Sequence, residues 1–343
     1  MPQGKLRKHR LKKLYPNNVR SPAWVAWMLG RKRRNRSRGP YVVFTNFTDR
    51  FGMQVKGSGT LTVDWDDGTT SSYALSGADQ NVTKVYATAA TRSITMVGNI
   101  TKINADETAP LGGVGSFGCA GDLSKLPNLD YIRTVGANLT SCLMQEWPGI
   151  TSIYCGGLSP MCGAVQPWPL LTDLGLWGLN ACHGNMMPWP SITKICLVGY
   201  NTVGGPLQSW PLVTYILFLG NNTAWGTLGS WPGMTYLSLG GFNTVTGSVA
   251  AMTVLQYLKE GGSCNLTHPA DWSPFLGLCY VEVKNLAQSE VDNLLVSMDA
   301  NTGQTKLRVE RTVICTAGCA GPSGTGLAAK ASLIGKGYSV TTN

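Results

Sequence analysis

Apolar residues in the central part of the chain recur with a period of 21 residues. Five Trp-Pro pairs mark this period, at positions 147–148, 168–169, 189–190, 210–211 and 231–232. Each pair is followed by an apolar triplet of constant spacing, which behind Trp189 consists of Ile192, Ile195 and Leu197. A unit of this length buries its apolar face only against neighbouring units, so the pattern predicts a solenoid of stacked coils.

The last two members of each triplet alternate with other residues, which is typical of a short strand. We predict parallel strands over about 123–283. The side chains predicted to point inward are Leu174, Leu176, Ile195, Leu197, Ile216, Phe218, Leu237 and Leu239. The Trp side chains are predicted to form a packing ladder on the back of the coils.

Asn and Gly residues follow the triplets in the same phase. The Asn residues stand at 138, 180, 201, 222 and 243, and the Gly residues at 163, 184, 205, 226 and 247. An Asn amide at this position is expected to hydrogen-bond backbone groups of the neighbouring coil, and Gly permits a turn with positive φ. The whole pattern resembles the leucine-rich repeat, and this resemblance implies a solenoid.

Residues 40–104 have the pattern of a small antiparallel β protein. Gly59–Trp65 alternates with period two and runs into a hairpin turn, and further strands are predicted at 82–86 and 92–97. We predict a β-sandwich over 40–104. The stretch Trp65–Thr69 resembles the Trp-Gly-Asp-Gly-Thr signature of polycystic-kidney-disease-type (PKD-type) sandwich domains. Its Asp66 and Asp67 are interpreted as caps of backbone amides rather than as calcium ligands.

The pattern changes after residue 283. A helix over 289–298 with Ser289 as its N-cap, a strand at 307–310 and a second helix over 323–336 are predicted. The fold class is therefore mainly β, with four predicted segments. These are a basic arm at 1–39, the sandwich at 40–104, a leucine-rich-repeat solenoid at 105–283 and an α/β cap at 284–343.

Two short stretches of the cap, Gly326–Lys330 and Gly335–Val340, look like the tail of leucine-rich-repeat proteins from bacteriophages and their bacterial hosts. The order of sandwich, solenoid and cap is similar to theirs. This resemblance implies a structural protein of the virion, in the capsid, head fibre or tail, present in multiple copies. The alternative is a bacterial surface adhesin. The basic arm stands where an export signal is expected, which favours a virion assembled in the host cytoplasm.

Positive charge is concentrated in the arm, where 13 of the 28 basic residues precede residue 40 without one acidic residue. The remaining 15 basic residues are outnumbered by 18 acidic ones, so the body is not a basic nucleic-acid-binding surface. An apolar segment separates two basic clusters and predicts docking onto capsid, connector or tail proteins. Nucleic acid is the alternative partner. The predicted anchoring residues are Lys5, Arg7, Lys8, Arg10, Lys12, Lys13, Trp24, Trp27, Arg31, Lys32, Arg33 and Arg34.

Catalytic signatures are missing from the sequence. The three His residues lie near no nucleophile motif, and no phosphate-binding loop or membrane-spanning run occurs. We therefore predict no enzymatic activity and no cofactor. A weak metal candidate consists of Cys142, Cys162, Cys182 and His183, because adding one period to Cys162 gives His183. Small buried filler is the favoured interpretation of these cysteines.

Outward positions beside the inward triplets are rich in aromatic residues and poor in charge. Such surfaces are typical of protein interfaces and predict a contact face for a partner or a host receptor. The alternative is that exposed strand positions simply favour Tyr and Thr. The predicted face consists of Tyr131, Tyr154, Trp177, Tyr215, Tyr236 and Tyr257.

Overall fold

The structure is a computed structural model that describes most of the chain from residue 39 onward. The described ranges are 39–46, 48–106, 119–121, 123–135, 142–144, 147–157, 161–178, 181–301, 311–315 and 318–343. All predicted anchoring residues of the arm lie outside these ranges, as do Asn138, Asn180 and the strand predicted at 307–310. Residues 39–343 form one compact unit.

The segment predicted as a sandwich is an antiparallel sheet region. Its strands are β1 (Tyr41–Asn46), β2 (Arg50–Asp64), β3 (Thr70–Ser76), β4 (Gln80–Val85), β5 (Arg92–Asp106) and β6 (Cys119–Gly121). The long strand β2 pairs with β3, β4 and β5, and β1 pairs with β5 and β6. Phe44, Phe51 and Trp65 are buried in its core, with ring centroids 6.0 and 5.9 Å apart in succession.

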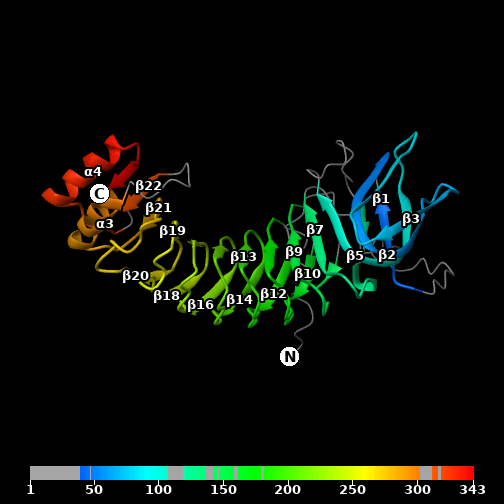
Figure 1. Cartoon of the computed structure of the whole chain (residues 1–343), viewed down its shortest axis with the longest axis horizontal. Coiled ribbons are helices and arrows are strands. Elements are labelled where there is room, and N and C mark those ends of the chain that lie inside the picture. Colours follow the sequence, from blue (N-terminus) through cyan, green and yellow to red (C-terminus); the bar gives the residue numbers. More distant parts are fainter. Residues whose placement is uncertain are drawn as a thin grey trace, which may run out of the picture. The chain divides into compact units, whose positions relative to one another are not determined.

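Strand β5 pairs with strands of both the antiparallel region and the solenoid. Its first half pairs with β1 in antiparallel orientation, while Lys102–Asp106 pairs in parallel with β7 (Tyr131–Val135) of the solenoid. The boundary predicted after residue 104 therefore lies inside a strand. Hydrogen bonds along β5 join the antiparallel region and the solenoid into one continuous sheet (Figure 1).

The repeats form a parallel β-solenoid in which each coil contributes strands to two sheets (Figure 1). The first sheet continues from β7 through β9 (Ser152–Cys155), β11 (Asp173–Leu176), β13 (Lys194–Leu197), β15 (Tyr215–Phe218), β17 (Tyr236–Leu239), β19 (Tyr257–Glu260) and β21 (Tyr280–Val283). The second consists of β8 (Cys142–Leu143), β10 (Met161–Ala164), β12 (Ala181–Asn185), β14 (Thr202–Pro206), β16 (Thr223–Thr227), β18 (Thr244–Ser248) and β20 (Asn265–Thr267). The parallel solenoid and its 21-residue period are thus confirmed, whereas the second sheet was not predicted.

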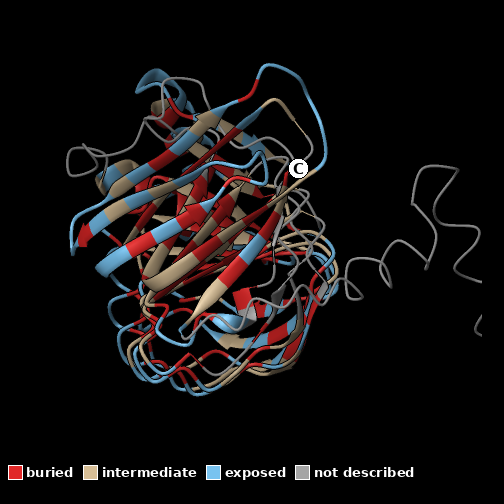
Figure 2. Cartoon of the chain, turned by 90° about the vertical axis from the view of Figure 1, so that its right-hand side faces the viewer, coloured by how far each residue is buried: buried red, intermediate tan, exposed pale blue. Residues whose placement is uncertain are grey.

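The core lies between the two sheets, as the end-on view shows (Figure 2). All eight residues predicted to point inward are buried, and Leu197 has no exposed surface. Trp168, Trp189, Trp210 and Trp231 are also buried and stack in succession at 6.4, 6.2 and 5.9 Å. The predicted packing ladder of Trp residues is therefore confirmed.

Asn side chains connect the coils through their amides. Asn222 Nδ2 donates to the carbonyl oxygens of Leu197, on the preceding coil, and Leu219, on its own coil, at 2.9 and 2.8 Å. Asn201 makes the equivalent pair of hydrogen bonds one coil earlier, and Asn243 one coil later. The predicted role of the Asn residues is confirmed for these three, all of which are buried.

Two glycine series accompany the coils, and only one was recognised in the sequence. The recognised series takes positive φ as predicted, at 105° for Gly184, but it lies within the strands of the second sheet. The other series follows the strands of the first sheet. There Gly199 has φ of 95°, and a Cβ atom would lie 2.5 Å from the carbonyl oxygen of Gly178. Close approach between successive coils therefore requires glycine at this corner.

The C-terminal cap extends the first sheet. Helix α3 (Gln288–Asn301) leads to β22 (Thr312–Cys315), and helix α4 (Gly324–Gly335) leads to β23 (Ser339–Thr342). Both strands add to the sheet in parallel after β21. Ser289 is not the N-cap as predicted but lies in the first turn of α3, where the Glu290 carboxylate accepts a hydrogen bond from Ala287 N. In the described part of the chain, no helix is both long and apolar enough to cross a bilayer.

Leu197→Ala tests the burial of the triplet. Because Leu197 is fully enclosed, we expect the substitution to lower the free energy of unfolding by about 2–5 kcal/mol, measured by urea denaturation. The control is Leu170→Ala, whose side chain is 51% exposed and where we expect a small effect. Equal losses in the free energy of unfolding for the two variants would contradict the inward position of the triplet.

Asn222→Ala tests the hydrogen bonds between coils. The substitution removes the side-chain donor from the carbonyl oxygens of Leu197 and Leu219. The Leu197 oxygen keeps its hydrogen bond from Leu219 N at 2.9 Å, so we expect a loss of about 1–3 kcal/mol, mainly from the Leu219 oxygen. Asn221→Ala is the matched control, since its side chain is half-buried and adjacent in sequence. If both variants unfold thermally at the wild-type midpoint, the Asn hydrogen bonds between coils do not contribute to the stability of the protein.

Candidate functional site

The outward face of the first sheet carries two rows of side chains. In the first row the strand register aligns Tyr131, Ser152, Asp173, Lys194, Tyr215, Tyr236, Tyr257 and Tyr280. The second row lies two residues further along each strand and includes Arg133, Tyr154, Lys259 and Glu282. Of the predicted face, Tyr131, Tyr215, Tyr236 and Tyr257 thus share the first row, while Tyr154 belongs to the second row.

Four tyrosines of the first row form a continuous stack. The ring centroids of Tyr215, Tyr236, Tyr257 and Tyr280 are 4.2, 4.2 and 4.1 Å apart in succession, with interplanar angles of 9–11°. Lys194 Nζ lies 5.0 Å from the Tyr215 ring centroid and closes one end of the stack. Neighbouring rings cover each other's faces, so the stack presents ring edges and hydroxyl groups outward.

One end of the stack meets an ion pair. Tyr280 donates to Glu282 Oε2 at 2.8 Å, and Glu282 pairs with Lys259 Nζ at 2.7 Å. At the other end the stack meets the ammonium of Lys194. Charged groups therefore stand at both ends of the stacked tyrosines.

The stack changes the acidity of its tyrosines. Burial between its neighbours raises the pKa of Tyr257 above its usual value of 10.0, and the electrostatic influence of the adjacent Tyr236 and Tyr280 adds to this effect. Burial, together with the hydrogen bond to Glu282, also raises the pKa of Tyr280. Both phenols therefore stay neutral at physiological pH, and the row carries hydroxyl groups rather than phenolates.

A second aromatic group lies nearer the antiparallel region. Tyr154 and Trp177 meet edge-to-face at 6.2 Å, and the Tyr154 hydroxyl group donates to Asp173 Oδ1 at 2.9 Å. The guanidinium of Arg133 and the ammonium of Lys194 lie 5.7 and 5.9 Å from the Tyr154 ring centroid. This part of the face therefore combines aromatic rings with charges, unlike the tyrosine stack.

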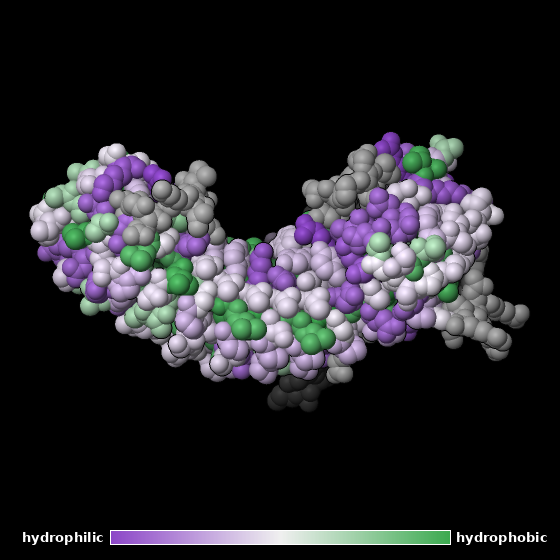
Figure 3. Space-filling view, in the orientation of Figure 1, coloured by the Kyte–Doolittle hydropathy of each residue, from purple (hydrophilic) through white to green (hydrophobic). Residues whose placement is uncertain are grey.

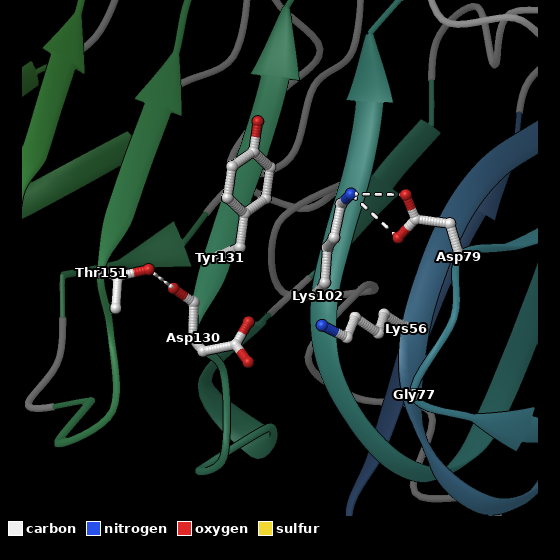
Figure 4. Close-up of a pocket in the computed structure, with 7 residues that line it drawn as sticks. All are labelled: Lys56, Gly77, Asp79, Lys102, Asp130, Tyr131 and Thr151. Atoms are coloured by element: carbon white, nitrogen blue, oxygen red, sulfur yellow. Dashed lines mark hydrogen bonds and ion pairs between the residues drawn. The ribbon is translucent and has the colours of Figure 1, made fainter.

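A polar hollow of about 470 Å³ lies at the start of the same row, where the antiparallel region meets the solenoid (Figure 4). Lys102 donates to both carboxylate oxygens of Asp79 at 2.9 Å, and its ammonium lies 5.1 Å from the Tyr131 ring centroid. Lys56, Gly77, Asp130 and Thr151 complete the lining. The hollow is polar and open, and it continues the contact face at one end.

Some exposed apolar side chains lie elsewhere on the solenoid. In the view of Figure 3 they appear as separate patches between polar stretches. They include Leu170, Leu212, Trp225 and Phe242, which are 51–66% exposed. Isolated exposed apolar residues are common on soluble proteins, so they define no site by themselves.

The alignment of Cys162 with His183, on which the weak metal candidate rests, is wrong. Cys162 aligns with Ala181, and His183 aligns with Ala164, because successive strands of the second sheet pair with an offset of 19 rather than 21 residues. Cys182 is buried while the neighbouring His183 is exposed, as expected for adjacent residues of a strand. Within the described residues, no three His, Cys, Asp or Glu side chains converge as a metal site.

The acidic turn of the antiparallel region has a structural role. Asp67 accepts hydrogen bonds from Thr69 N at 3.0 Å and Thr69 Oγ1 at 2.6 Å, and it pairs with Lys84 at 2.6 Å. Lys84 and Thr69 together lower the pKa of Asp67 to about 2. Asp66 Oδ2 accepts a hydrogen bond from Ser93 N at 2.8 Å. The interpretation of these carboxylates as caps of backbone amides is confirmed.

Fold and face together define a β-solenoid protein with an aromatic sheet face. No protein-family model matches the chain, and no curated protein has a significantly similar sequence. The class of protein therefore rests on the architecture of residues 39–343.

One member of the face, Tyr280, was missed in the sequence. It follows Tyr257 by 23 residues rather than 21, so it falls outside the strict period. The apolar residues Val281 and Val283, which flank the outward Glu282, follow it on the same strand. Leu278, Val281 and Val283 fit the apolar triplet two residues out of phase, and the same shift applied to the outward positions places Tyr280 in the row.

The raised pKa of Tyr257 predicts a pH effect on stability. The unfolded chain releases this proton near pH 10, whereas the folded chain keeps it, so the free energy of unfolding falls as pH rises above about 10. Tyr257→Phe should make this fall less steep, measured by urea denaturation on either side of pH 10. If the free energy of unfolding falls with pH as steeply in Tyr257→Phe as in the wild-type protein, folding does not raise the pKa of Tyr257.

Proposed function

We propose that this protein is a non-enzymatic structural protein of a bacteriophage virion, anchored by its basic arm. The outward face of the first sheet is its recognition surface for a partner or host receptor. The proposal extends the resemblance of the repeats to leucine-rich repeats, and of the antiparallel region to PKD-type sandwiches. Both resemblances rest on sequence motifs.

The observation that carries the recognition role is the tyrosine stack. A regular row of aromatic edges and hydroxyl groups extends over four successive strands, and the ion pair between Lys259 and Glu282 balances its nearest charges. Aromatic, charge-poor surfaces are enriched in binding interfaces, and tyrosine contributes a large contact area at a low cost in side-chain entropy. The solenoid holds this row on rigid strands, which reduces the entropy lost on binding.

The anchoring role rests on the composition of residues 1–39. Trp24 and Trp27 lie between two basic clusters, and burying them against a partner contributes about 25 cal/mol per Å² of apolar surface. The flanking Arg and Lys residues pair with acidic groups of that partner. The arm and the face are thus separate contact regions with separate tasks.

The test is a mass-spectrometry peptide inventory of purified virions and host envelope fractions, with wild-type and variant chains. We expect wild-type chain in the virions and loss of incorporation for a chain lacking residues 1–39. Tyr236→Asp with Tyr257→Asp should leave incorporation intact but impair attachment of the particles to host cells. Chain found in the envelope fraction instead of the virions would contradict the virion proposal.

A further inference from the structure

The polar hollow beside the antiparallel region holds a positive charge that the described part of the chain leaves unpaired. Lys56 of β2 lies directly opposite Lys102 of β5 in the strand register, so two like charges are neighbours. Asp79 binds Lys102 at 2.9 Å and thereby neutralises one of them. Among the residues that the structure describes, the ammonium group of Lys56 has no hydrogen-bond or ion-pair partner.

Asp130 adds an unpaired negative charge to the same hollow. It stands one period before a ladder of threonines whose hydroxyl groups donate to carbonyl oxygens of the preceding coil. Thr151 donates to Asp130 O at 2.9 Å, and Thr172 donates to Thr151 O at 3.0 Å. A carboxylate has no proton with which to continue this ladder. The Asp130 side chain instead points into the hollow toward Lys56, and no ion pair joins the two groups (Figure 4).

We propose that this hollow binds a small dipolar ligand, such as a free amino acid, whose ammonium group pairs with Asp130 and whose carboxylate pairs with Lys56. The inference goes beyond the proposed function and does not depend on the virion role. The two lysines and two aspartates of the lining sum to zero charge, which matches a ligand without net charge.

The two unpaired charges separate a dipolar ligand from other small molecules. A ligand with one charge pairs with one group and takes water from the other, and a neutral sugar takes water from both. Removing water from an unpaired charge is unfavourable. A dipolar ligand forms a charge-assisted hydrogen bond with each group, and such bonds are stronger than those between neutral groups.

The size and the aromatic wall of the hollow also fit a small organic ligand. Its volume of about 470 Å³ lies within the usual range of small-molecule sites. Tyr131 has the ammonium of Lys102 at 5.1 Å from its ring centroid, and its neighbour on the next coil is the small Ser152. No aromatic ring of the described residues stacks on Tyr131, unlike the tyrosines of the stack. The ring therefore offers apolar surface to the carbon skeleton of a ligand.

The test is calorimetry of the full chain with glycine, β-alanine and longer ω-amino acids, compared with acetate, ethylammonium and glucose. We expect a dipolar compound to bind, with the best chain length matching the span from Lys56 to Asp130. Lys56→Met and Asp130→Asn should each weaken binding roughly tenfold or more. The matched controls are Lys125→Met and Asp49→Asn, at residues outside the lining, and both should bind like wild type.

Thermal unfolding of each variant checks that the protein stays folded. Binding of a dipolar compound that depends on both Lys56 and Asp130 supports the inference. It is overturned if no dipolar compound binds at millimolar concentrations, as when Lys56 and Asp130 pair with each other in solution. Equal binding of acetate, ethylammonium or glucose, or wild-type binding by either variant, also overturns it. None of these results bears on the tyrosine stack, whose recognition role is tested by host attachment.

Discussion

Register between successive coils is the constraint on which the rest of this structure depends. Each coil buries its apolar triplet against the next coil. The 21-residue offset between strands of the first sheet places residues with the same structural role side by side. Leu197 and its equivalents fill the interior, Trp189 and its neighbours stack behind them, and Asn222 joins the carbonyl groups of two coils. The outward tyrosines are a consequence of the same register, because a shift by one residue would turn every side chain to the opposite face.

The face is therefore as rigid as the core beneath it. Tyr236 lies directly before the buried Leu237 on one strand, so its position is fixed by packing on the inner side. Stacking on Tyr215 and Tyr257 then fixes the ring. Under the proposed recognition role, a partner would meet side chains that are already ordered, which lowers the entropy lost on binding.

Much of this architecture was predictable because the repeat is strict where the core is largest. The inward triplets, the Trp ladder and the common phase of Tyr215, Tyr236 and Tyr257 all follow from the period. The second sheet was missed because its strands are rich in Thr and Gly, with Val203 or Val245 as the one buried apolar side chain of a strand. Its different offset also made the alignment of Cys162 with His183 wrong. The pairing of β5 with strands of both regions was missed because the sequence pattern of a strand does not show which strands pair with its two edges.

Side-chain oxidation footprinting with mass spectrometry tests most directly whether the outward sheet face is the recognition surface. Hydroxyl radicals modify exposed tyrosines of the full chain, first free and then bound to host cells through the particle. The account predicts that Tyr215, Tyr236 and Tyr257 become protected on attachment, while Tyr200, outside the face, keeps its reactivity. Unchanged modification of the stacked tyrosines on attached particles would contradict it.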